Sequence, residues 1–138
     1  MKAGRWIHVL NPYDWLPSYG ESAVSLTNSG LDLVVTIEYD GSDGAVQHKE
    51  LLFEGTCFFY RASLPGPYML DVVHDCKVTP PHLGALVEYP DSEAALVWRK
   101  HYGGSRKVNH YRIVFLSENL ILEVLAGSVV LRAEISSA

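Results

Sequence analysis

The stretch NHYRIVFLSENLILEVLAGSVVLRAEI, residues 109–135, decides the fold class, because apolar and polar residues alternate along it between two turn signals. The turn signals are Glu118-Asn119 and Gly127-Ser128. They separate three predicted strands, which cover residues 109–116, 120–126 and 129–135. The pattern predicts an antiparallel meander of three strands with one apolar face.

The lengths of the two turns determine which residues face each other. A two-residue first turn places Phe115 opposite Leu122, and a two-residue second turn places Val124 opposite Leu131. A slip by one residue in either hairpin would turn Glu123 towards the core, where an unpaired charge is costly. We therefore expect Phe115, Leu122, Val124 and Leu131 to share the core face.

The other face of the predicted meander carries a row of charges, Arg112, Glu123 and Arg132. Four aliphatic residues share that face: Val114, Ile121, Leu125 and Val130. A sheet face open to water is usually more polar than this. We therefore expect the aromatic segment from Trp6 to Tyr19 to lie as a lid over the sheet, with Glu123 partly buried between the two arginines.

Further strands are expected upstream. Residues 31–39 alternate strictly, and a turn at Ser29-Gly30 would pair Leu26 with Leu33 and so continue the apolar face. Four more apolar runs read as strands, at residues 47–53, 57–62, 70–78 and 84–89.

One helix is expected, from Asp91 to Tyr102. Asp91 or Ser92 is a suitable N-cap, and Gly103-Gly104 supplies the stop. The chain of 138 residues suits a single domain covering residues 1–138. We expect an α+β domain: a mainly antiparallel, twisted sheet, barrel-like or split in two, with one short helix. An all-β sandwich is the alternative.

Composition limits the classes of protein to which this chain can belong. The net charge of −5 gives no general attraction to nucleic acid or to an anionic membrane. No signal peptide and no apolar run of about 20 residues, the length that spans a bilayer, is recognisable. A cytoplasmic protein is expected, in which Cys57 and Cys76 are reduced by default and a disulfide between them stays open.

The segment Asp71-Val-Val-His74-Asp75-Cys76, followed by His82, holds the strongest candidates for chemistry. On a strand, His74 and Cys76 point to the same side as Leu70, Val72 and Val78, which favours a buried pair. A zinc site would need a fourth ligand, and a reactive thiol assisted by His74 would need an orienting group. His74, Cys76 and His82 therefore form the alternative site of a small enzyme or a ligand- or metal-binding domain.

Common catalytic motifs are missing from the sequence. It has no G-x-S-x-G elbow, no phosphate-binding G-x-x-x-x-G-K-[ST] loop, no H-E-x-x-H and no strand-linked G-x-G-x-x-G. We expect no catalytic residues, no cofactor and no metal.

Charge is segregated in one place. From Arg99 to Arg112 there are five Lys or Arg residues and no Asp or Glu. One interpretation is a helix end whose basic residues complement the dipole, followed by a solvated loop. The other is a patch that docks an acidic protein partner, formed by Arg99, Lys100, Arg106 and Lys107.

Several short segments carry a resemblance. They are Leu51-Leu-Phe-Glu-Gly55, Glu88-Tyr-Pro-Asp-Ser-Glu93, His110-Tyr-Arg-Ile-Val-Phe115 and Leu122-Glu-Val-Leu-Ala126. In this order the chain resembles small bacterial proteins of unknown function, over most of residues 31–135. Leu116-Ser-Glu-Asn119 departs from the Asp-rich turn with Gly that such chains carry. Comparable families include immunity proteins, so the resemblance implies a non-catalytic, immunity-like protein that binds a protein partner or forms a homodimer.

Overall fold

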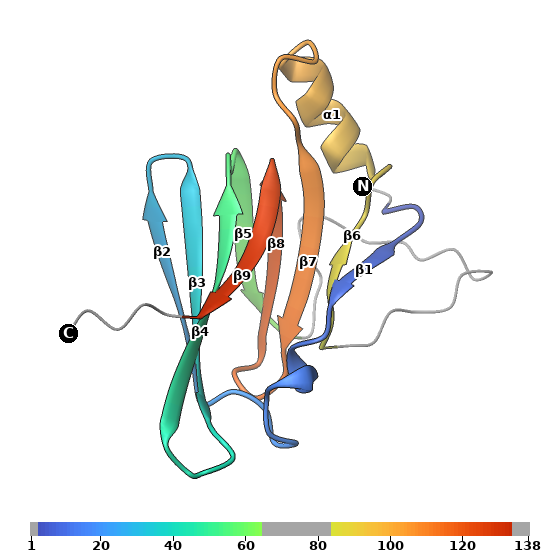
Figure 1. Ribbon diagram of the computed structural model, residues 1–138. Coiled ribbons are helices and arrows are strands. Elements are labelled where there is room, and N and C mark those ends of the chain that lie inside the picture. The colour runs from blue at the N-terminus through green and yellow to red at the C-terminus, as the bar shows by residue number, and fades with distance from the viewer. Residues whose placement is uncertain (1–2, 65–83, 134–138) are drawn as a thin grey trace.

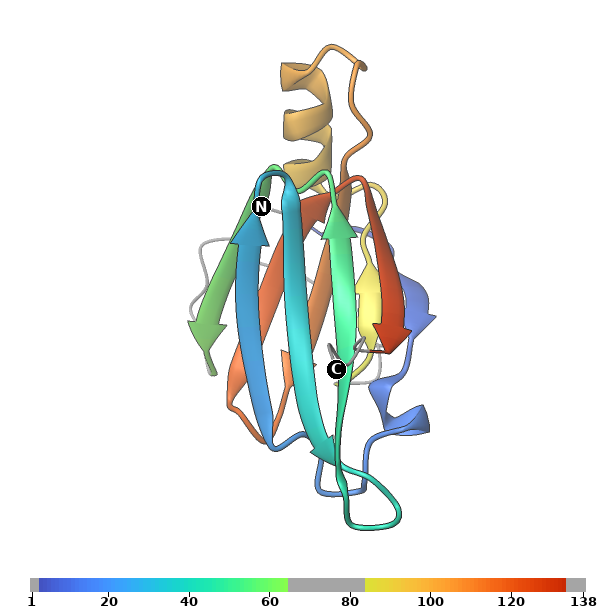
Figure 2. The same cartoon turned by 60° about the vertical axis from the view of Figure 1, so that its left-hand side comes forward.

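Two antiparallel sheets form the body of the protein (Figures 1 and 2). The computed structural model describes residues 3–64 and 84–133. The first sheet has the order β1 (Ile7–Leu10), β6 (Leu86–Glu88), β7 (Asn109–Phe115), β8 (Leu120–Ala126) and β5 (Phe58–Ser63). The second has the order β2 (Ala23–Ser29), β3 (Asp32–Asp40), β4 (Val46–Glu54) and β9 (Ser128–Ala133). A 3-10 turn, η1 (Pro12–Asp14), and one helix, α1 (Glu93–His101), complete the described elements.

The main core lies between the sheets. Both sheets contribute fully buried side chains to it, among them Leu33, Ile37, Leu51, Phe53, Ile113 and Leu122. The expected mainly antiparallel fold with one short helix is confirmed, and the sheet is split in two without closing into a barrel within the described residues. The predicted helix is also confirmed, with Ser92 as its N-cap and Tyr102 as its C-cap.

The predicted register of the first hairpin was wrong by two residues, while its faces were right. Phe115 lies opposite Leu120, because the turn spans four residues and Asn119 takes a left-handed conformation with φ of 52°. Leu26 likewise pairs with Val35, since Gly30 and Leu31 form the turn between β2 and β3. A shift of two residues keeps every side chain on its face, so the predicted core side survives.

The second predicted hairpin was wrong, because β9 does not pair with β8. Leu131 faces Leu51 of β4, and Arg132 faces Glu50. The chain turns a corner at Gly127, whose N–H donates to the Glu54 carbonyl oxygen at 2.8 Å. The predicted row of three charges across one sheet therefore does not exist, and Arg132 lies in the other sheet.

Two neighbouring strands change sheets together at this corner. The chain passes from β4 to β5 beside the passage from β8 to β9, and the two connections stay paired. Glu54 lies opposite Ser128, and Phe58 lies opposite Leu125, so three residues (55–57) oppose two (126–127). The extra residue is a bulge at Gly55, where φ is 63°. This bend lets one long ribbon belong to both sheets.

The prediction that residues 6–19 lie as a lid over the sheet was wrong for most of this segment. β1 is an edge strand that pairs with β6. Trp6 packs against Val87 and Tyr89, on the face of the first sheet that points away from the core. Trp15 packs instead against the core between the sheets. The predicted strand at residues 70–78 lies outside the described residues.

Candidate functional sites

The structure places the predicted docking residues around the C-terminal end of α1. Arg99 donates from Nε to the Val108 carbonyl oxygen at 2.7 Å. Arg106 donates from Nη2 to the Gly55 carbonyl oxygen at 3.3 Å, and its guanidinium lies 4.6 Å from the centre of the Tyr102 ring. Arg99 thus links α1 to the residue before β7, and Arg106 fastens the loop after α1 to the body of the protein.

The two lysines of the predicted patch are exposed, and two exposed aliphatic side chains lie on the same helix as Lys100. Leu96 is 51% exposed, and Val97, the next residue on α1, is 55% exposed. Lys100 follows Leu96 by one helical turn, and Lys107 lies in the loop that leads to β7. Figure 1 shows α1 projecting beyond the end of the two sheets. We call Leu96, Val97, Lys100 and Lys107 the helix surface.

A buried chain of polar side chains lies beneath α1, on the face of the first sheet that points away from the core. The Ser92 Oγ accepts the Ala95 N–H at 3.0 Å and lies 2.8 Å from His110 Nδ1. His110 Nε2 makes a close contact with Glu123 Oε2. Glu123 Oε1 lies 3.4 Å from Arg112 Nε. This chain links the first turn of the helix to β7 and β8.

The order serine, histidine, glutamate resembles a nucleophilic triad in composition alone. Ser92, His110 and Glu123 are 0%, 2% and 1% exposed, so a substrate has no access to the hydroxyl. The Ser92 oxygen is also engaged as a helix cap. Nucleophilic catalysis needs the attacking oxygen within reach of the substrate. The arrangement is therefore suited to holding α1 on the sheet.

The sequence contained part of the signal for this network. His110 and Arg112 lie two residues apart on one strand and therefore share a face, and Glu123 lies on the same face of the next strand. Parity therefore brings the three together whether the turn has two residues or four. Ser92 could not be added, because no spacing in the sequence shows which sheet face the start of α1 covers.

The residues of the alternative enzyme or ligand site, His74, Cys76 and His82, lie outside the described residues, so that site stays a prediction. Cys57 is a free thiol that lies 3.4 Å from the Leu125 carbonyl oxygen, and burial raises its pKa more than Arg106 lowers it. Among residues 3–64 and 84–133, no three His, Cys, Asp or Glu side chains gather closely enough to hold a metal ion.

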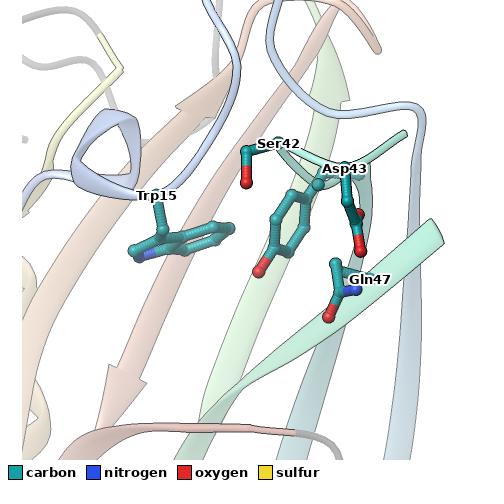
Figure 3. A pocket seen from close by; sticks show the side chains of 6 residues that line it. Trp15, Ser42, Asp43 and Gln47 are labelled. Carbon is teal, nitrogen blue, oxygen red and sulfur yellow. The ribbon is translucent and has the colours of Figure 1, made fainter. Parts of the chain in front are cut away.

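A cleft opens beside Trp15, the residue after η1 (Figure 3). Figure 1 shows η1 at the end of the protein opposite α1. It has a volume of about 320 Å³ and is lined by Trp15, Tyr39, Gly41, Ser42, Asp43 and Gln47. The Trp15 and Tyr39 ring centres lie 5.0 Å apart. An adjoining hollow of about 360 Å³ shares Trp15, Gly41 and Ser42 and extends to Leu16, Pro17, Tyr19 and Asp40. The cleft was not predicted from the sequence.

No protein-family model, no curated protein and no solved structure matches this chain. The resemblance to small bacterial proteins therefore stays a prediction. No helix within the described ranges has the length and apolar character needed to cross a membrane.

Proposed function

We propose that this chain is a non-catalytic, immunity-like binding protein that holds an acidic protein partner on the helix surface. The observation that carries the proposal is the pair Leu96 and Val97, each more than half exposed beside the basic residues that follow. Burying such side chains against a partner is favourable by about 25 cal/mol for each Å² of apolar area.

One side of α1 is already used by the fold. Ala94, Trp98 and Tyr102 pack with Phe58 and Leu125, while Leu96 and Val97 point elsewhere. The helix thus has one face fixed to the body and another available for contact. A helix held in this way loses little conformational entropy when it binds.

Charge supports an acidic partner. The protein as a whole carries −5, yet residues 99–112 contain five Lys or Arg and no carboxylate. Lys100 and Lys107 are exposed, whereas the exposed carboxylate of Glu93 lies in the first turn of α1. The positive charge that would attract an acidic surface is therefore at the C-terminal end of the helix and in the loop after it. Because Arg99 and Arg106 donate to backbone carbonyls, they hold the loop in place for that contact.

Affinity capture from extracts of the source cells tests the proposal. The variants are Leu96→Ser with Val97→Ser, and Lys100→Glu with Lys107→Glu. Matched controls change exposed residues outside the helix surface, Val46→Ser and Arg61→Glu. We expect one acidic protein that wild type and both controls retain, that both helix-surface variants lose, and whose binding weakens as salt rises.

Two outcomes contradict the proposal. One is that every captured protein survives both helix-surface variants or is lost equally with the controls. The other is that light scattering gives a dimer for wild type and a monomer for the helix-surface variants, because a second copy would then be the occupant.

A further inference from the structure

The residues of β4 that pair with the core-facing residues of β3 change from apolar to polar near the cleft. On β3 the core-facing residues are Leu33, Val35, Ile37 and Tyr39. Their partners on β4 are Phe53, Leu51, Lys49 and Gln47. The row on β4 therefore turns from apolar to polar at the cleft, although strand parity still points it inward. Gln47 is exposed, so this end of the row lies beyond the core, where its amide can reach a ligand in the cleft.

We propose that this cleft binds a neutral, polyhydroxylated ligand of the size of one sugar ring. The ligand stacks on Trp15 and hydrogen-bonds to Ser42, Asp43 and Gln47. A volume of about 320 Å³ is at the lower end of the range for small-molecule sites, which suits a single ring. This site lies at the other end of the molecule from the helix surface and does not depend on it.

Aromatic and polar groups meet in the cleft in the way that such a ligand requires. Figure 3 shows the Trp15 indole on one side and Asp43 and Gln47 on the other, with Ser42 above the space between them. The Tyr39 ring, whose centre lies 5.0 Å from that of Trp15, belongs to the same lining. The indole offers a flat apolar surface to ring C–H groups. The hydroxyl and the amide both donate and accept, and the carboxylate accepts. Alternating hydroxyl groups on a sugar ring need donors and acceptors together.

The loop that carries these groups is held in shape by its own backbone. Gly41 donates to the Ala45 carbonyl oxygen at 2.8 Å, and Gly44 donates to the Gly41 carbonyl oxygen at 2.9 Å. Asp43 Oδ1 accepts the Ala45 N–H at 2.9 Å, which leaves Oδ2 for a ligand. A Cβ atom at residue 41 would lie 2.9 Å from Gln47 Cγ. Gly41 therefore makes the space in which Gln47 reaches the cleft.

The position of Lys49 disfavours a cationic ligand on the indole, although cations are the other class that aromatic clefts attract. The Lys49 Nζ lies 5.6 Å from the centre of the Trp15 ring, so a cation is already present at this indole. A second cation beside it would be repelled. Asp40 and Asp43 keep their negative charges, but Asp40 lines only the adjoining hollow, where its Oδ2 accepts the Tyr19 hydroxyl at 2.9 Å. The experiment includes a cationic probe, which tests whether these carboxylates attract a cation in spite of Lys49.

Saturation-transfer NMR with the full chain tests the proposal. The probes are D-glucose, D-galactose, D-mannose and N-acetyl-D-glucosamine, each at millimolar concentration, with tetramethylammonium chloride as the cationic probe. We expect transfer to at least one sugar, with affinity reduced by about fivefold or more in Trp15→Ala and Gln47→Ala. Val46→Ala is the matched control, because residue 46 neighbours Gln47 and points to the opposite face.

Gln47→Ala and Asp43→Asn keep the test decisive if Trp15→Ala fails to fold, since both residues are exposed. Three results overturn the proposal: transfer to none of the four sugars, equal transfer in wild type and the Gln47→Ala variant, or transfer to tetramethylammonium alone. Loss of the helix-surface partner would leave sugar binding unchanged, so the two proposals fail separately.

Discussion

Replacing Glu123 with Gln is expected to destabilise the protein strongly. The carboxylate is 1% exposed and meets two basic side chains, His110 through Oε2 and Arg112 through Oε1. The amide keeps the shape of the side chain and removes its charge. Arg112 would then lie beside a neutral group in a mostly buried setting, with its side chain only 18% exposed.

The expected loss is about 3 kcal/mol of unfolding free energy. Breaking a buried ion pair by removing one partner costs about 3–5 kcal/mol, because the other charge stays buried and uncompensated. The lower end applies, since Arg112 retains some contact with water. With a urea dependence of about 1–3 kcal/mol per M, the midpoint should fall by about 1–3 M.

Urea denaturation followed by tryptophan fluorescence measures this loss in Glu123→Gln, Arg112→Met and the double variant. The two residues touch, so their effects should not add. The double variant should be more stable than the sum of the single losses predicts, because it removes both charges of the buried pair.

A midpoint for Glu123→Gln within error of wild type, at an unchanged urea dependence, would refute the reasoning. It would mean that water reaches the carboxylate despite its burial. Strict additivity in the double variant would show that Arg112 and Glu123 do not interact.

Three further variants test neighbouring features in the same assay. Ser92→Ala should cost about 2 kcal/mol, because it removes the cap on the Ala95 N–H and leaves a buried imidazole nitrogen without its partner; a loss below about 0.5 kcal/mol would contradict this. Arg132→Met should cost roughly 1–3 kcal/mol, because the Arg132 side chain is 44% exposed but the Glu50 side chain that it pairs with is only 14% exposed and would lose this partner; no measurable loss would argue that water already solvates Glu50. Tyr89→Phe should change stability by less than about 1 kcal/mol at pH 7, because the buried hydroxyl makes no hydrogen bond of normal geometry and interacts only with the nearby Arg112 guanidinium. Burial raises the Tyr89 pKa above 10.0, against the lowering effect of the Arg112 guanidinium, so its contribution is complete below pH 10.0 and is lost at higher pH. Tyr89→Phe should therefore reduce the alkaline loss of stability, and identical pH profiles for the two proteins would contradict this.

Periodicity predicted the faces of the strands better than their partners. Ile113 and Phe115 point to the core as expected, because each observed register differs by an even number of residues from the predicted one. Turn length was the weak point. Nothing in Leu116-Ser-Glu-Asn119 distinguishes a turn of two residues from one of four before the φ of Asn119 is known.

The pairing of β9 could not be predicted from its own sequence. Gly127-Ser128 is compatible with a tight hairpin and with a corner between sheets. What decides between them is β4, more than 70 residues earlier in the chain, whose Leu51 and Phe53 face Leu131 and Val129. Such a contact between distant segments leaves no local signal.

The same limit applies to the candidate sites. Basic residues near α1 were visible as a run, yet their roles differ. The cleft could not be found, because Trp15 and Gln47 come from segments that meet only in the folded chain. A partial signal existed in β4, where Gln47 and Lys49 continue the alternation of Leu51 and Phe53 with polar side chains.

Contacts at the corner between the sheets show that the basic residues from Arg99 to Arg112 have different structural roles. Arg106 donates to the Gly55 carbonyl oxygen, and Asn109 Nδ2 donates to the Gly127 carbonyl oxygen at 3.1 Å. The loop after α1 is thus tied to both strands at the point where they change sheets. Removing Arg106 would loosen this attachment whether or not the residue ever touches a partner. Lys100 and Lys107 are exposed, so changes at these two positions test the proposed docking without disturbing the corner.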